Sequence, residues 1–177
     1  MRNLFSAIGI VLLMTSCADL LPKFIPPQPR QIQNTFPVDK PFDSVWQAVI
    51  EAFAELNLPI DNLERDSGLI TTDWINFQEQ NPENGYCDCG KVLIPQSSSP
   101  DWIMGRPIKE EDVTAKTYTT FKVRGRFNVF VKESEQGPCE IKINSIFETD
   151  FDTEQKSCLS TGRLEASLYK IIQKKLG

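Results

Sequence analysis

Two long segments in which apolar and polar residues alternate constrain the fold of this chain more than any other feature. The first segment, residues 118–132, places one set of apolar side chains on a common face: Phe121, Val123, Phe127, Val129 and Val131. The alternate positions carry cations: Lys122, Arg124, Arg126 and Lys132. Because successive side chains of a strand point to opposite faces, the pattern predicts a long strand with one buried and one exposed face.

The second segment follows the turn residues 135–138 and has the same alternation. Its apolar face carries Ile141, Ile143 and Phe147, and its polar face carries Glu140, Lys142 and Glu148. Opposite charges on the exposed faces of paired strands favour pairing by about 0.2–1 kcal/mol per contact. The sequence therefore predicts an antiparallel pair, although the basic outer face is also compatible with a binding surface.

Two further segments have the spacing of amphipathic helices. The first stripe contains Val45, Trp46, Val49, Ile50, Phe53 and Leu56, and the second contains Leu164, Leu168, Ile171, Ile172 and Leu176. Apolar residues three and four apart cover one face of a helix. We expect Asp39 to cap the first helix, with Pro41 in its first turn, and residues 160–162 to start the second helix. Trp46 is expected in the core.

Shorter strands complete the predicted domain. Residues 36–38 and 60–64 are expected to be strands, and 69–77 a partner for 60–64 across the turn 66–68. The fold class is α+β: a single domain over residues 36–177, with an antiparallel β-sheet and two helices packed on one face. Residues 78–116, rich in Gly and Pro, are expected to be a long insertion that is tied down.

The N-terminus has the pattern of a bacterial lipoprotein signal. An apolar run of about eleven residues, 4–14, follows Arg2 and is too short to span a bilayer. The run ends in Leu13-Met14-Thr15-Ser16-Cys17, which resembles the lipoprotein processing site. Residues 1–16 are then the signal peptide, and Cys17 receives lipid chains such as palmitate. The alternative is an ordinary secretory signal or signal anchor with an incidental cysteine.

The residues after Cys17 suggest a location. By resemblance to the sorting rule of enteric bacteria, Ala18 in place of aspartate directs the lipoprotein to the outer membrane of a Gram-negative cell, facing the periplasm. Residues 17–35 contain several prolines, which exclude a helix or a central strand. We expect this segment to be a semi-extended tether.

Composition excludes several classes of function. The net charge is −5, and removal of residues 1–16 takes away Arg2 and no acidic residue, so the mature chain is a poor partner for nucleic acid. The chain has no histidine, which removes the commonest general base and metal ligand and every Ser-His or Cys-His nucleophile. We expect no cofactor and no metal.

Four cysteines remain after lipidation of Cys17: Cys87, Cys89, Cys139 and Cys158. An even number in an oxidising compartment suggests disulfides. A bridge within Cys87-Asp88-Cys89 would be strained. Two pairings therefore remain: Cys87 with Cys139 and Cys89 with Cys158, or the converse, Cys87 with Cys158 and Cys89 with Cys139. The sequence lacks the Cys-x-x-Cys spacing that is usual in zinc sites with four thiolates and in redox-active cysteine pairs, so neither alternative is favoured.

Several motifs resemble the repeated domains of BamC-like outer-membrane lipoproteins. They are the runs 41–46, 56–60 and 66–70, followed by Trp74. The resemblance covers residues 36–77 well and the last strands and helix in outline. It implies a helix-grip fold, a role as an accessory member of the machinery that inserts β-barrels into the outer membrane, and no catalytic residue.

These observations predict a non-enzymatic outer-membrane lipoprotein, anchored in the membrane at Cys17, that binds an envelope protein partner in outer-membrane protein assembly. The alternative is a periplasmic small-molecule or lipid binder with a cleft between helix and sheet. Trp74, Trp102 and Phe130 would line that cleft. A hydrolase that uses the acidic run 110–112 is a third class, but adjacent loop carboxylates are usually just solvated.

Overall fold

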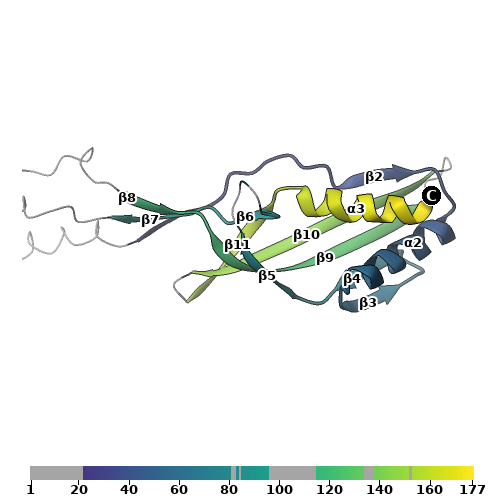
Figure 1. The fold of residues 1–177 in the computed structure, drawn as a ribbon, viewed down its shortest axis with the longest axis horizontal. Coiled ribbons are helices and arrows are strands. Elements are labelled where there is room, and N and C mark those ends of the chain that lie inside the picture. The colour runs from purple at the N-terminus through teal and green to yellow at the C-terminus, as the bar shows by residue number, and fades with distance from the viewer. Residues whose placement is uncertain (1–21, 81–82, 84, 96–114, 134–137, 152) are drawn as a thin grey trace, which may run out of the picture. The chain divides into compact units, whose positions relative to one another are not determined.

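The computed structural model describes residues 22–80, 83, 85–95, 115–133, 138–151 and 153–177. This part of the chain is an α+β protein with two helices and antiparallel strand pairs (Figure 1). The chain divides into two compact units. The prediction of α+β architecture is confirmed, whereas a division into two units was not predicted from the sequence.

The smaller unit contains a three-stranded antiparallel sheet. Its strand order is β1-β7-β8, with bounds Lys23–Ile25, Lys91–Pro95 and Ala115–Tyr118. Two sequence predictions are corrected here. Residues 23–25 form an edge strand instead of free tether, and part of the 78–116 insertion forms paired strands. Prolines exclude central strands, yet the residues between them keep the N–H groups that an edge strand needs.

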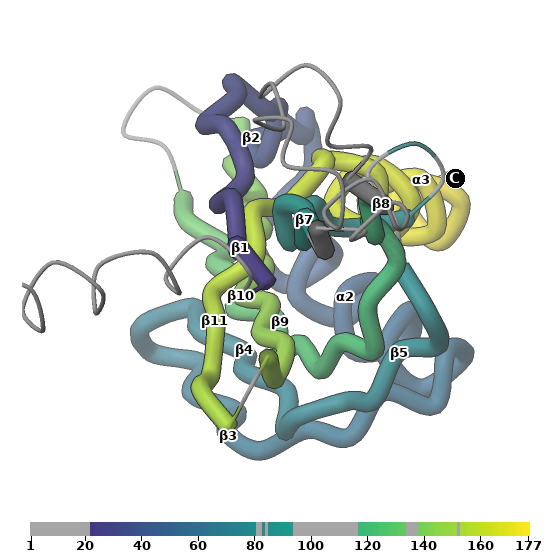
Figure 2. Tube along the Cα trace, turned by 90° about the vertical axis from the view of Figure 1, so that its left-hand side faces the viewer, coloured from purple at the N-terminus to yellow at the C-terminus, as the bar shows by residue number. Residues whose placement is uncertain are grey.

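The larger unit is organised around two long paired strands, β9 (Phe121–Glu133) and β10 (Cys139–Phe151). Their register runs from Glu133 opposite Cys139 to Arg124 opposite Glu148. The predicted alternation is confirmed, because the buried residues of both strands lie at every second position. Figure 2 shows β9 and β10 running alongside one another, with β11 next to β10.

Shorter strands extend this sheet on both sides. Beside β9 lie β4 and β5, with β3 outside β4; their bounds are Leu69–Thr72, Ile75–Gln80 and Ile60–Glu64. Beside β10 lie β2 and β11, with β6 outside β11; their bounds are Thr35–Val38, Glu154–Ser160 and Cys87–Asp88. The expected strand 69–77 is divided at residues 73–74. Strand β11 was missed, because Cys158 is its one buried residue and no alternation marks it.

Two helices, α2 (Phe42–Glu55) and α3 (Arg163–Leu176), are built from the predicted apolar stripes. The cap of α2 was predicted wrongly: the N-cap is Pro41, without a side-chain cap, and not Asp39. The start of α3 is confirmed, since Gly162 precedes it with φ 82° and donates its N–H to Ser160 Oγ at 3.0 Å. None of the described helices is long and apolar enough to cross a membrane.

The main core lies between the helices and the sheet of this unit. Its buried residues come from both helices and from β2, β4, β9 and β10: Phe36, Val38, Val45, Trp46, Ala48, Val49, Ala52, Phe53, Ile70, Val129, Val131, Cys139, Ile141, Ile143, Leu168 and Ile172. Trp46 belongs to the core, as its place in the stripe predicted. Burial of this many apolar side chains is the main stabilising contribution to the unit.

The second half of the predicted tether is attached to the larger unit. Asn34 accepts the N–H of Ile143 with its backbone oxygen at 2.8 Å, and its side-chain amide donates to Asn144 Oδ1 at 3.0 Å. Arg30 Nη2 lies 2.6 Å from Asp88 Oδ2. Residues 26–34 have no regular secondary structure, but these long-range bonds give them a fixed path that composition did not predict.

Candidate functional site

The most conspicuous surface of the larger unit is the face of β9 and β10 that points away from the core. We call it the open face, and it carries Arg124, Phe130, Lys132, Lys142 and Ile146. Phe130 and Ile146 are 36% and 37% exposed. These two side chains add apolar contact area to a surface that is otherwise mostly polar and charged.

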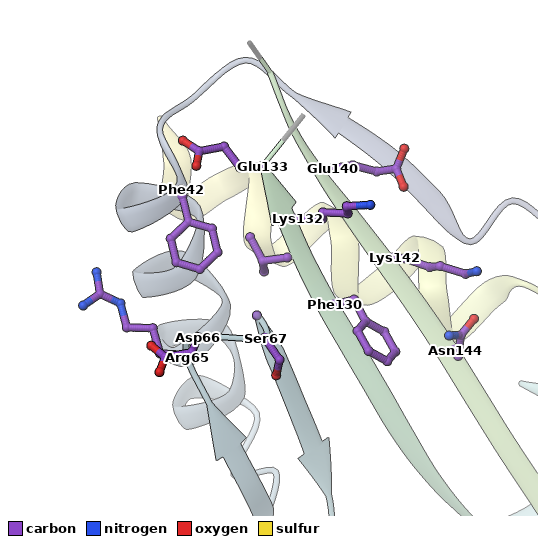
Figure 3. Close-up of a pocket in the computed structure, with 12 residues that line it drawn as sticks. Phe42, Arg65, Asp66, Ser67, Phe130, Lys132, Glu133, Glu140, Lys142 and Asn144 are labelled. Carbon is purple, nitrogen blue, oxygen red and sulfur yellow. The ribbon is translucent and has the colours of Figure 1, made fainter. Parts of the chain in front are cut away.

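A groove of about 990 Å³ lies at the open face. Its lining comes from the start of α2, the β3–β4 turn, β9 and β10: Phe42, Arg65, Asp66, Ser67, Gly68, Phe130, Val131, Lys132, Glu133, Glu140, Lys142 and Asn144. Figure 3 shows the strand side chains on one side of the groove and the turn residues 65–67 on the other. The fold therefore brings the start of α2 and the β3–β4 turn to the paired strands β9 and β10, which lie far along the chain from both.

The charges at the groove and along the open face are mixed. The groove lining contains three basic and three acidic residues. Lys132 lies opposite Glu140 in the strand register, and further along the same strands Arg124 Nη2 lies 3.2 Å from Glu148 Oε2. The predicted cross-strand complementarity is thus confirmed. A surface of mixed charge suits a partner of mixed charge better than a polyanion.

The β3–β4 turn is held against β9 through Gly68. The N–H of Val131 donates to the oxygen of Gly68 at 2.8 Å, and Gly68 has φ +68°. A Cβ atom at this position would lie 2.0 Å from the backbone oxygen of Val131. Only glycine allows this approach, so Gly68 fixes the position of the neighbouring groove residues 65–67.

Two of the three residues predicted to line a binding cleft are described by the structure, and they do not line the same groove. Phe130 lines the groove, whereas Trp74 is absent from its lining and lies under the guanidinium groups of Arg124 and Arg126, at 4.9 and 5.1 Å from the ring centroid. Trp102 lies outside the described residues. Within the described part of the chain, the space between helices and sheet is occupied by core side chains such as Phe53 and Ile143, which disfavours a cleft there.

The cysteines form a second cluster in the same unit. Cys89 is bonded to Cys158, which confirms one of the two expected bridges. Cys87 and Cys139 are buried free thiols, so the expected second bridge does not form. The reason is strand order. Cys139 lies at the start of β10 opposite Glu133 and Val38, whereas Cys87 lies in β6, which pairs with β11.

The free thiol of Cys87 lies next to the disulfide, with its Sγ 3.9 Å from Cys89 Sγ. Burial, and then the charge of Asp88, raise the pKa of Cys87 to about 12. Burial, and then the charge of Glu133, also raise the pKa of Cys139. Both thiols are therefore protonated at neutral pH, which makes them poor nucleophiles and disfavours a thiol-based enzyme.

Glu165 is a buried acidic residue whose burial was not predicted from the sequence. Glu165 is 0% exposed in the first turn of α3, and its Oε2 accepts a hydrogen bond from Ser160 Oγ at 2.8 Å. Its Oε1 has no partner among the described protein atoms. The predicted helix start at residues 160–162 is consistent with Glu165 in the first turn, but only tertiary packing shows that Glu165 is buried.

Two candidates from the sequence, Cys17 and the acidic run 110–112, lie outside the described residues. The sequence did not predict that Phe42, Asn144 and the turn 65–68 line a groove. The only pattern that pointed to them was a turn motif next to strands with alternating residues.

No protein-family model matches the chain, and no curated protein matches it either. The BamC-like resemblance therefore stays a prediction from motifs.

Proposed function

We propose that the chain is a non-enzymatic bacterial outer-membrane lipoprotein, anchored through Cys17 and facing the periplasm, that acts as an accessory factor in outer-membrane protein assembly by binding a protein partner. The groove at the open face is the single observation that carries the binding part of this proposal. The lipoprotein pattern at residues 13–17 supports the anchor, and the BamC-like motifs support the assembly role.

The chemistry of the groove favours a protein over a small ligand. Sites for small molecules are usually enclosed and mostly apolar, with a few polar groups. Here Phe42 and Phe130 are surrounded by Arg65, Lys132 and Glu140, among other charged residues. An aromatic centre with a rim of both charges resembles the composition of protein–protein interfaces.

The lining also supports a role without catalysis. No residue in the chain can supply an imidazole base. The hydroxyl of Ser67 in the groove donates to Glu64 Oε2 at 3.0 Å and lies 3.3 Å from the backbone oxygen of Glu64, so it stabilises the turn. We infer that the lining residues bind and orient a partner surface instead of reacting with a substrate.

A helix-grip arrangement is the finer fold that we propose for the larger unit. Its support is that α2 and α3 contact each other and share one buried cluster with alternate residues of β9 and β10. In such an arrangement the helices bury one face of the sheet and leave the other face accessible. The proposed partner would use that accessible face.

The test of the binding proposal is site-specific photo-crosslinking in the bacterium that encodes the chain. A benzophenone amino acid replaces Lys142 in the groove, and the matched control replaces Lys174, which is exposed on α3. We expect the probe at Lys142 to capture a component of the β-barrel assembly machinery, identified by mass spectrometry, and the probe at Lys174 not to capture it. Equal capture from both positions, or none from Lys142, would contradict the proposal.

The anchor has a separate test. Cells labelled with radioactive palmitate should give a labelled protein in the outer-membrane fraction, and Cys17→Ser should remove the label, because the thiol that accepts the diacylglycerol is absent. Cys139→Ser, which changes a buried thiol of the folded unit, should keep the label. Label that persists in Cys17→Ser would show that the anchor assignment is wrong.

A further inference from the structure

Three sulfur atoms of the larger unit lie close together, and the proposed function uses none of them. The Sγ atoms of Cys87, Cys89 and Cys158 all lie within 4.8 Å of one another. The three residues are 1%, 2% and 7% exposed. In the oxidised protein two of these atoms form the disulfide, and the third remains a thiol.

The backbone around this cluster is held by bonds that do not involve the disulfide. Cys87 lies opposite Ser160 in the β6–β11 pair. Thr161 donates its N–H to Tyr86 O and its hydroxyl to Gly85 O, both at 2.9 Å. Reduction of the disulfide would therefore leave residues 85–88 bonded to residues 159–161, with the three thiols close together.

We propose that, once the Cys89–Cys158 disulfide is reduced, Cys87, Cys89 and Cys158 together bind one Cu(I) ion through three thiolates. A metal–sulfur bond of about 2.3 Å in a trigonal arrangement separates the sulfur atoms by about 4.0 Å. The Cys87 and Cys89 sulfurs are already 3.9 Å apart. Reduction frees the side chains of Cys89 and Cys158 to rotate to the same spacing.

The ligand set selects Cu(I) over zinc. Structural zinc almost always has four ligands, and the cluster of possible ligands in the described residues contains only the three cysteines. The nearby carboxylate of Asp88 is occupied, because Oδ2 pairs with Arg30 at 2.6 Å and Oδ1 accepts the N–H of Gly90 at 2.8 Å. Soft thiolates favour Cu(I), which is stable with three ligands.

The reaction balances with a dithiol as the reductant. The dithiol transfers two electrons and two protons to the Cys89–Cys158 bond, which becomes two thiols, while the dithiol closes to its own disulfide. Cu(I) then displaces one proton from each of the three thiols, because a coordinating thiol is deprotonated. The disulfide form, with a single thiol in the cluster, is not expected to hold the ion, so binding depends on redox state.

The experiment uses the purified mature chain under anaerobic conditions, oxidised or reduced with a dithiol and then freed of reductant. Cu(I) is added in competition with a chromophoric Cu(I) chelator, and X-ray absorption counts the sulfur ligands. We expect the reduced protein to retain one Cu(I) with three sulfur neighbours and the oxidised protein to lose the ion to the chelator.

Two variants locate the site. Cys87→Ala should leave two sulfur neighbours and release copper at a lower chelator concentration, whereas Cys139→Ala, which removes the other free buried thiol, should behave as the unaltered chain. Failure of the reduced chain to compete for copper, two sulfur neighbours in place of three, or three in Cys87→Ala would overturn the proposal. If Cys87→Ala does not fold, the sulfur count of the unaltered chain decides.

Discussion

Replacement of Gly68 by alanine should destabilise the larger unit, because the added methyl group would collide with backbone atoms and not with a side chain that could move aside. The added Cβ would lie 2.0 Å from the backbone oxygen of Val131. The φ of +68° costs a residue with a Cβ about 1–2 kcal/mol. The turn must also move away from β9, which breaks the 2.8 Å bond from Val131 N to Gly68 O; a lost hydrogen bond of this kind costs about 1–2 kcal/mol.

Together these terms predict a loss of about 2–4 kcal/mol in the free energy of unfolding. For a chain of this size the midpoint of thermal unfolding should fall by roughly 4–16 °C. The assay is urea unfolding of the purified mature chain followed by circular dichroism, with a thermal scan as the second measurement. The magnitude depends on the backbone clash and not on the loss of any side chain.

The matched control is Gly162→Ala. Gly162 has φ +82°, but its added Cβ would lie 3.2 Å from the Cβ of Ile32, a contact that a shift of a few tenths of an ångström would relieve. This variant should lose only the conformational part, about 1–2 kcal/mol. If Gly68→Ala is no more destabilising than Gly162→Ala, close contact with β9 does not hold the turn in place.

Three further predictions concern other parts of the larger unit. Cys89→Ala should lower the free energy of unfolding by about 2–4 kcal/mol in urea titrations, because it removes the link to Cys158; an unchanged midpoint would contradict this. Phe53→Ala, at a 0% exposed core position, should cost about 3–5 kcal/mol in the same assay, and a smaller loss than Gly162→Ala would count against the assigned core. The hydrogen bond and charge of Lys175 lower the pKa of Glu55, so the ion pair stabilises at neutral pH and is lost as pH falls through that lowered pKa. NMR titration should show the Glu55 pKa rising towards its ordinary value in Lys175→Ala, and no rise would refute the pairing.

The long central strands and both helices could be predicted from the sequence alone. Their signals are local: a period of two residues at 121–133 and 139–151, and spacings of three and four residues in α2 and α3. A local period fixes which side chains share a face, and burial of that face then selects the element. The α+β class followed from the order of these elements along the chain.

The same reasoning failed where the period was short or absent. Strand β11 has one buried residue, so its place is decided by pairing with β10 and not by its own pattern. The proline-rich segment forms a strand at 23–25 because β7 offers a partner. Composition correctly excluded a helix there, yet it could not show which backbone groups find partners elsewhere in the chain.

Neither site could be predicted from the sequence, because each depends on contacts between distant segments. The groove depends on Gly68 lying against Val131, and the cysteine cluster depends on β6 pairing with β11. The sequence gives the number of cysteines and limits how they can pair. The strand register then separates Cys139 from Cys87 and places Cys87 close to Cys89 and Cys158. Residues close together along the chain encode which face of a helix or strand is buried. Sites are formed instead by contacts between segments whose register is set by packing of the whole unit.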